Sequence, residues 1–312
     1  MDFPISGAHI NPLALMASGL IIGLLGGFFG VGGSFLAGPA LFAFGVPMNF
    51  VVGTDLAHIV GKSVVAARQH RKLGNIDIKL GLLMVIGTLP GVELGAQGIQ
   101  YLKRFGHVDQ VVGITFIIVL VLISIFIAYE SWRTLKMEKN KNFQKTNAIG
   151  SAEKGKGDVS ALSGLAKHVQ RLHLPPMVKL PTSGIKSISL WTILAVAFIG
   201  GIFSGFLGGG AGYIRMPALV YLLGVPTHLA VGTDLFEIII SAGYGTVSHA
   251  IKGNVDILIA LVMHTGAAIG AQLGANLTEY FHGPRIRLAF VPLPLLGAAL
   301  VVYTLVTGRH LG

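Results

Sequence analysis

The chain has 312 residues, of which 53% are hydrophobic and only 12% are charged, whereas soluble domains contain about 25% charged residues. Its formal net charge is +10 and it has no cysteine. This composition indicates a membrane protein and excludes disulfides, a thiolate metal site and a cysteine nucleophile. We assign the positive charge to cytoplasmic loops rather than to nucleic-acid binding.

Long uncharged stretches carry the membrane prediction. Five of them are free of Asp, Glu, Lys and Arg: residues 3–54, 111–129, 187–214, 257–278 and 288–308. Each is near or above the ~18 residues that cross a bilayer. A buried soluble core explains one such stretch but not five.

The first half divides into five apolar segments. They are expected at about 12–29, 34–44, 50–70, 77–102 and 108–130, with a glycine-rich break before the second. The second segment has 11 residues, too few to cross a bilayer at ~1.5 Å per residue. We therefore expect a half-helix or a re-entrant piece there.

A basic linker follows. Eleven of the 23 Lys and Arg fall within 133–186, against three acids, and this stretch is also rich in Ser, Gly and Asn. It is expected to be mobile and hydrophilic, and its charge places it on the cytoplasmic side of a bacterial inner membrane. The chain is thus divided into a first transmembrane repeat at 1–132, the linker at 133–186 and a second transmembrane repeat at 187–312.

The second half repeats the first. Its segments are expected at 187–207, 213–223, 229–250, 255–280 and 286–306. At an offset of 179, residues 45–96 and 224–275 are identical at 21 of 52 positions. We predict an all-α polytopic fold of two homologous repeats, each with one short helix, as in secondary transporters. An odd number of chain reversals per half favours inverted repeats, with parallel halves as the alternative.

The glycine breaks are the first candidate binding elements. GFFGVGGSFLAGPAL at 27–41 aligns with GFLGGGAGYIRMPAL at 205–219. Unwound backbone at the start of a half-helix presents free N–H groups and a positive dipole to an anion. The alternative is tight helix packing through small residues. The residues assigned to anion binding here are Gly32, Gly33, Ser34, Gly209, Gly210 and Gly212.

The motif VGTDL occurs at 52–56 and 231–235. Thr54 and Thr233 are candidates for substrate contact through their hydroxyls. The neighbouring Asp55 and Asp234 are candidates for proton or cation coupling, because an acid within a membrane is a functional candidate by default. In the alternative reading each Asp caps a helix N-terminus.

Other ionisable residues lie within the apolar segments. His58 and Glu237 occupy equivalent positions and are candidates for coupling, as is Glu93, while His264 and Lys62 lack charged counterparts. Arg215 is assigned to the anion because its planar fork suits an oxyanion. Its alternatives are a pairing with an acid such as Glu237 or a position at the lipid interface.

A repeated turn completes the motifs. HRKLGNIDI at 70–78 and HAIKGNVDI at 249–257 combine turn residues with an Asp that can cap the next helix. No metalloprotease, Walker or nucleotide-binding motif is present, so we predict no enzyme activity, no cofactor and no metal site. An intramembrane metalloenzyme using His58, His264, Glu93 or Glu237 is the weakest alternative.

The glycine, proline and VGTDL motifs of both halves resemble the sulfite exporter TauE/SafE family, over about 13–132 and 187–307. The resemblance implies transport of a small sulfur oxyanion or organosulfonate, such as sulfite, sulfoacetate or thiosulfate. The residue after VGT, usually serine or another small polar residue in the family, is Asp here in both halves. We therefore predict a secondary transporter of a small anion, with a channel-like anion pathway or a carboxylate permease as alternatives.

Overall fold

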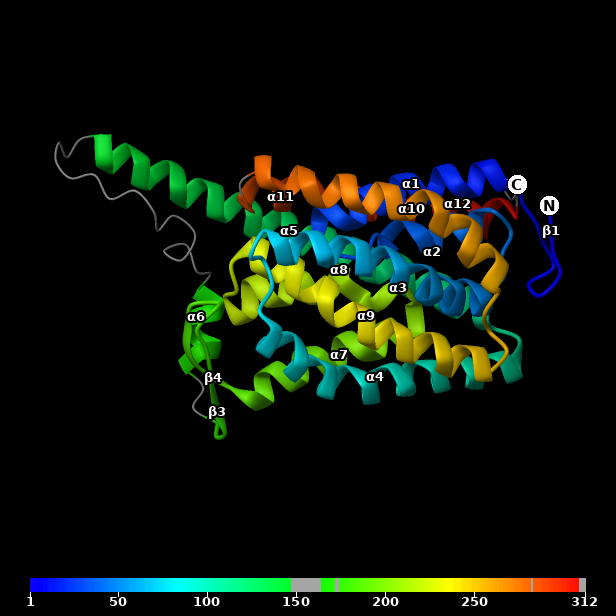
Figure 1. Ribbon diagram of the computed structural model, residues 1–312, viewed down its shortest axis with the longest axis horizontal. Coiled ribbons are helices and arrows are strands. Elements are labelled where there is room, and N and C mark those ends of the chain that lie inside the picture. Colours follow the sequence, from blue (N-terminus) through cyan, green and yellow to red (C-terminus); the bar gives the residue numbers. More distant parts are fainter. Residues whose placement is uncertain (147–163, 172–173, 282, 309–312) are drawn as a thin grey trace.

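Helices make up nearly all of the computed structural model, which describes residues 1–146, 164–171, 174–281 and 283–308. The helices run along the long axis of the molecule, with the N-terminal hairpin at one end and strands β3 and β4 at the other (Figure 1). Seven helices of the described residues are long and apolar enough to span a bilayer. The prediction of an all-α polytopic membrane protein is confirmed.

The first half begins with a hairpin and continues with five helices. These elements are β1 (Asp2–Phe3), β2 (Ala8–His9), α1 (Pro12–Phe29), α2 (Ser34–Ala43), α3 (Met48–Lys72), α4 (Ile78–Phe105) and α5 (Val108–Thr146). Asn11 caps α1 by accepting a hydrogen bond from the Leu13 N–H, with Pro12 at the first helical position. The expected short segment is α2, which has 10 residues.

The remaining elements also include a hairpin, a long helix, a break and a short helix in this order. Its elements are α6 (Gly164–Arg171), β3 (Met177–Leu180), β4 (Ile185–Ser189), α7 (Leu190–Leu207), a 3₁₀ turn (Gly209–Ala211), α8 (Gly212–Ala218), a π turn (Leu219–Leu223), α9 (Thr227–Ile251), α10 (Ile257–Leu277), a 3₁₀ turn (Thr278–Tyr280), α11 (Gly283–Phe290) and α12 (Pro292–Thr307). The expected short segment is α8 with its π turn. The segment expected at 286–306 is instead interrupted at Val291, because Pro292 starts a new helix.

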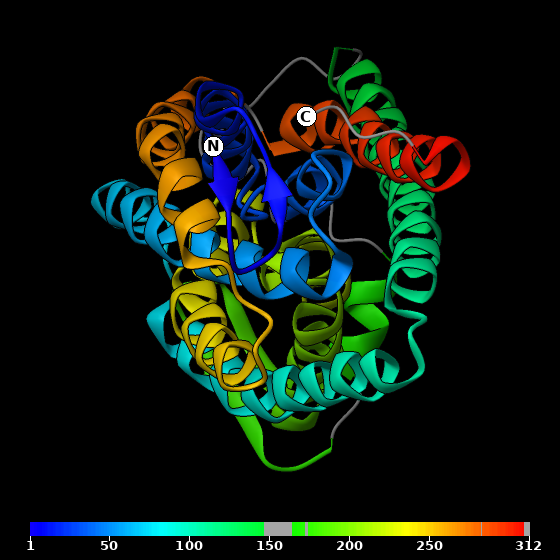
Figure 2. The ribbon, with the colours of Figure 1, turned by 90° about the vertical axis from the view of Figure 1, so that its right-hand side faces the viewer.

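The linker is more ordered than expected where the structure describes it. α5 continues to Thr146, and β3 pairs antiparallel with β4 immediately before α7. The hairpin β1–β2 holds the corresponding place before α1 and lies across one end of the bundle (Figure 2). Residues 147–163 of the predicted linker lie outside the described part.

Two pairs of helices are in very close contact, α1 with α10 and α4 with α7. A Cβ on Gly23 would overlap the backbone of Ala267, and a Cβ on Gly205 would overlap the backbone of Val92. The glycines that meet backbone in this way are Gly19, Gly23, Gly27, Gly266, Gly270 and Gly274 in the first pair and Gly87, Gly91, Gly95, Gly201 and Gly205 in the second. The tight-packing role considered for small residues therefore applies to these positions.

Helices α3 and α9 pack against each other in the middle of the bundle (Figure 1). In α3, 67% of the most apolar stretch is buried, against 33–44% in the other six candidate spans. These central helices contain the two VGTDL motifs, so the fold places both motifs in its interior.

Candidate functional site

The two glycine breaks are true interruptions of the helices. Gly30, Gly32 and Gly33 have positive φ angles between α1 and α2, and Gly208, Gly209 and Gly210 do so between α7 and α8. Only glycine adopts this left-handed backbone at low cost. Neither α2 nor α8 has a side-chain N-cap or an acid in its first turn. Both short helices therefore start at a break, as the sequence predicts.

The two breaks lie against each other. A Cβ on Gly209 would overlap Ser34 and would lie 2.7 Å from Asp55 Oδ2. A Cβ on Gly212 would lie 2.7 Å from Val31 and 2.7 Å from Asp234 Oδ2. The structure thus brings the glycine residues, Ser34 and both VGTDL aspartates to one place at the centre of the bundle.

Arg215 of α8 forms a buried cluster with two acids of α9. Its Nε lies 2.9 Å from Asp234 Oδ1, and its Nη1 lies 2.5 Å from Glu237 Oε2. All three side chains have no exposed area, and Gly200 of α7 leaves the space that the Arg215 methylenes fill. The pairing of Arg215 with Glu237, one of the alternatives to an anion site, is therefore present. Among the described residues, Arg215 Nη2 and Asp234 Oδ2 have no hydrogen-bond partner.

A second buried cluster follows one face of α3. Asp55, His58 and Lys62 are spaced by three and four residues, with His58 Nδ1 3.5 Å from Asp55 Oδ1 and 3.3 Å from Lys62 Nζ. Their exposed fractions are 2% or less. Neither oxygen of Asp55 has a hydrogen-bond partner among the described residues. Lys62 was not assigned to the site from sequence, although its spacing from Asp55 and His58 could have identified it.

The threonines of the VGTDL motifs join the two halves. Thr54 Oγ1 accepts a hydrogen bond of 2.9 Å from the Asp256 N–H, and Thr233 Oγ1 accepts one of 2.9 Å from the Asp77 N–H. Each hydroxyl oxygen therefore already accepts a hydrogen bond from the backbone of the other half. The O–H group of each threonine is still available as a donor, so the predicted contact with an anionic substrate stays a prediction.

The capping alternative for the VGTDL aspartates is wrong. α3 begins directly after Pro47 and α9 directly after Pro226, so Asp55 and Asp234 lie two turns inside their helices. The capping prediction for Asp77 and Asp256, by contrast, is confirmed.

Asp77 Oδ1 accepts from the Leu80 N–H, and Asp256 Oδ1 accepts from the Leu258 and Ile259 N–H groups. Serines of the two hairpins also donate to these caps. Ser183 Oγ lies 2.6 Å from Asp77 Oδ2, and Ser6 Oγ lies 2.8 Å from Asp256 Oδ2. Sequence reasoning missed both serines, although each precedes a glycine in its hairpin turn.

Glu93 is not part of the central clusters. Its Oε1 lies 2.9 Å from Lys252 Nζ, and Ser248 donates to its Oε2 at 2.6 Å. His264 is half-buried, and its imidazole fills the space beside Gly61 on α3, next to Lys62. No group of three or more His, Asp or Glu side chains in the described residues has the arrangement of a metal site.

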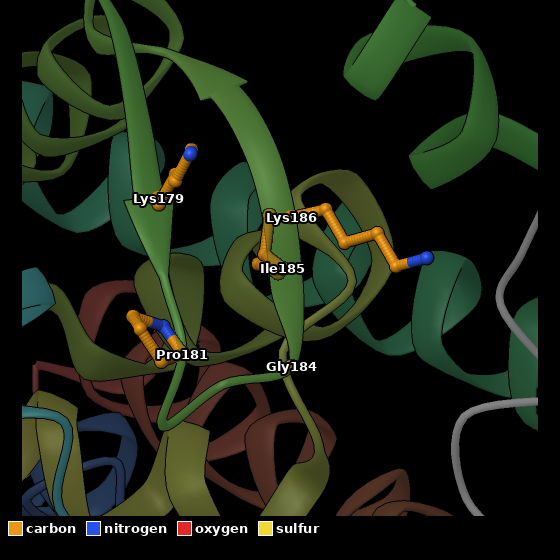
Figure 3. A pocket seen from close by; sticks show the side chains of 5 residues that line it. All are labelled: Lys179, Pro181, Gly184, Ile185 and Lys186. Atoms are coloured by element: carbon orange, nitrogen blue, oxygen red, sulfur yellow. The ribbon is translucent and has the colours of Figure 1, made fainter.

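Two cavities lie away from the center. One, of about 490 Å³, is lined by Lys179, Pro181, Gly184, Ile185 and Lys186 of the hairpin β3–β4 (Figure 3). The other, also of about 490 Å³, is lined by Gln97, Gly98, Gln100, Tyr101, Arg104 and Lys252. Both are lined by basic residues, Lys179 and Lys186 in the first and Arg104 and Lys252 in the second.

Comparison with known families decides the class of protein. Residues 15–301 match the family described as Sulfite exporter TauE/SafE. The chain belongs to the sulfite exporter TauE/SafE family. This family consists of membrane transporters rather than enzymes, and the resemblance seen in the glycine and VGTDL motifs is confirmed.

Two curated relatives cover nearly the whole chain, and a third covers less than half of it. The chain is 27% identical to the probable membrane transporter protein YunE of Bacillus subtilis, over 92% of this chain and 96% of the relative. It is 24% identical to YjnA of the same organism, over 93% and 96%. It is also 26% identical to sulfite exporter TauE/SafE family protein 5 of Arabidopsis thaliana, over 42% of this chain and 30% of the relative. No solved structure matches the chain.

Proposed function

We propose that the protein is a secondary transporter for a small anion, a sulfur oxyanion or an organosulfonate, bound where the two glycine breaks meet. One observation carries this proposal. Arg215 is fully buried beside the breaks, and its Nη2 has no hydrogen-bond partner in the described structure. An unused guanidinium N–H inside a membrane protein suits an oxyanion, with the backbone N–H groups of α2 and α8 as further donors.

The charges of the site determine how an anion can bind. Lys62 and Arg215 supply two positive charges, whereas Asp55, Asp234 and Glu237 supply three negative charges when all are ionised. The sum is one negative charge, which repels an anion in a medium of low dielectric constant. Anion binding therefore requires that at least one carboxylate is neutralised, which makes a coupled cation or proton part of the proposal.

The proposed transport cycle uses two inverted repeats. Matched contacts support this arrangement. Thr54 accepts from the backbone of Asp256, and Thr233 accepts from the backbone of Asp77. In the same way, the ring Nε2 of His70 contacts a carbonyl oxygen of α1, and that of His249 contacts one of α7. In addition, β4 leads into α7 at the opposite end of the bundle from the N-terminal hairpin (Figure 1). The basic linker would then lie in the cytoplasm of a bacterial cell.

A ligand screen tests the proposal. Purified protein is heated with sulfite, sulfate, thiosulfate, taurine, sulfoacetate or simple carboxylates, and its unfolding temperature is recorded. A ligand at 100 times its Kd stabilises the folded state by about 2.7 kcal/mol, so a sulfur oxyanion or sulfonate should raise the unfolding temperature. Stabilisation by carboxylates alone would assign the protein to a carboxylate permease instead.

The decisive variant is Arg215→Lys, which keeps the charge but removes the planar fork. We expect it to fold and to lose most of the stabilisation by the anion. Counterflow in proteoliposomes then separates a carrier from a channel-like pathway, because an open pore gives none. An unchanged anion response in Arg215→Lys would contradict the assigned site.

A further inference from the structure

The two buried clusters at the center are equivalent in position but not in chemistry. Asp55 corresponds to Asp234, but His58 corresponds to Glu237 and Lys62 to Ser241. The cluster of the second half combines two carboxylates with the guanidinium of Arg215, whereas the α3 cluster combines one carboxylate with an imidazole and an amine. The two clusters therefore differ in the groups that can pass a proton to a carboxylate.

Of the three buried carboxylates at the centre, Asp55 has the fewest hydrogen bonds to stabilise a negative charge. Asp234 accepts from Arg215 Nε, and Glu237 accepts from Ser241 Oγ, whereas neither oxygen of Asp55 has a hydrogen-bond partner in the described structure. An ionised carboxylate that is buried without hydrogen bonds is costly. Protonation removes that cost, so Asp55 is a suitable acceptor for a proton.

Three residues extend from Asp55 toward the side of the bundle. His58 and Lys62 follow on the same face of α3. Half-buried His264 of α10 then packs on Gly61, close enough to Lys62 for their charges to interact. The position equivalent to His264 is Val85. The series of titratable groups therefore joins α3 of the first half to α10 of the second, and the equivalent positions do not repeat it.

The surroundings of Asp55 add few other charges. Tyr213 of α8 interacts electrostatically with it. α9 contributes Asp234 and Glu237, which face Arg215, while its Ile238 and Ala242 pack on α3. Helices α1, α2 and α7 contain no titratable residue. A bound metal cation is disfavoured because the Lys62 ammonium group lies 3.3 Å from His58.

We infer that Asp55, His58, Lys62 and His264 form the proton pathway of the transporter, distinct from the anion site at Arg215. In each cycle a proton arrives through His264, Lys62 and His58 and binds the Asp55 carboxylate. This removes the negative charge that opposes the anion, and the proton leaves again when the anion is released. The inference rests on the proposed anion transport and names the residues that couple it to protons.

The test measures protons moved per anion in proteoliposomes with a trapped pH dye. Thiosulfate is the probe, because bisulfite carries its own proton and crosses membranes as sulfur dioxide. We expect the wild-type protein to move protons with thiosulfate and Asp55→Asn to lose this coupling. The matched variant Asp234→Asn should change the half-saturating thiosulfate concentration but keep the proton-to-anion ratio. His58→Gln serves as the second relay variant if Asp55→Asn does not fold.

The outcomes separate the two proposals. Absence of thiosulfate counterflow in the wild-type protein, together with no stabilisation by any anion, would overturn the proposed function and this inference with it. Thiosulfate transport without proton movement in the wild-type protein would overturn only the proton pathway. An unchanged proton-to-anion ratio in both Asp55→Asn and His58→Gln would also overturn it.

Discussion

Arg215 Nε lies 2.9 Å from Asp234 Oδ1, and both side chains are completely buried although they come from different helices. The pair fixes the first turns of the short helix α8 to the middle of α9. It also ties the second glycine break to the second VGTDL motif. This contact therefore helps to set the local geometry of the proposed anion site.

Removing Arg215 should destabilise the protein strongly. Arg215→Ala leaves Asp234 and Glu237 buried without their cation, and breaking a buried ion pair in this way costs about 3–5 kcal/mol. Urea titration of the purified protein in detergent should show a corresponding decrease in the free energy of unfolding. The double variant Arg215→Ala/Glu237→Gln removes one of the two uncompensated charges and should recover part of the loss. Equal stability of the single and double variants would show that the cluster charges do not control folding.

The contact between the two glycine breaks should not tolerate a methyl group. In Gly209→Ala the new Cβ would overlap Ser34, and the alanine would have to adopt the positive φ of 64° that Gly209 has. Gly74→Ala is the matched control, because Gly74 has a similar φ of 72° but nothing within 4 Å of the added Cβ. The control should lose only the ~1–2 kcal/mol of left-handed backbone strain. Gly209→Ala should lose clearly more, as measured by urea titration.

A second variant tests the contact between Ser34 and position 209 by removing the Ser34 side chain. Ser34→Gly combined with Gly209→Ala removes the side chain that the methyl group meets first. The double variant should therefore be more stable than Gly209→Ala alone. If Gly209→Ala and Gly74→Ala cost the same, the breaks are not in contact in the folded protein.

The threonine hydroxyls should contribute equally in the two halves. Thr54→Val and Thr233→Val keep the shape of the side chain but leave the buried N–H of Asp256 or of Asp77 without its acceptor. An unsatisfied buried N–H costs about 1–3 kcal/mol, so both variants should lower the free energy of unfolding by that amount. Replacing either threonine with serine keeps the hydroxyl, so these variants should retain much of the free energy of unfolding that the valine variants lose. A loss in only one half would contradict the matched roles.

The sequence predicted the structure correctly where the signal lies within one short stretch of the chain. The helix, break and short-helix order of 12–44 and 187–223 could be predicted because uncharged length and glycine clusters are local signals. The caps Asp77 and Asp256 could also be predicted, because an Asp after a turn dipeptide begins the next helix.

The failures concern helix boundaries, contacts between distant parts of the chain and one short hairpin. The VGTDL aspartates were compatible with capping because the sequence does not show that α3 and α9 start right after Pro47 and Pro226. The partners of Thr54 and Thr233 lie 202 and 156 residues away. Only the folded arrangement of the helices reveals such pairings. The hairpin β3–β4 was hidden in the basic linker, since its strands have four and five residues and no strong alternation.

The glycine-to-backbone contacts of α1 with α10 and of α4 with α7 have a mechanical consequence. Each of these closely packed pairs contains one helix from each half of the chain, so the two halves cannot separate as independent rigid bodies. In the proposed carrier, a change of access from one face of the membrane to the other would move each of these helix pairs as a unit. The moving parts of such a carrier would be composites, and their boundaries would not follow the boundary between the two sequence repeats.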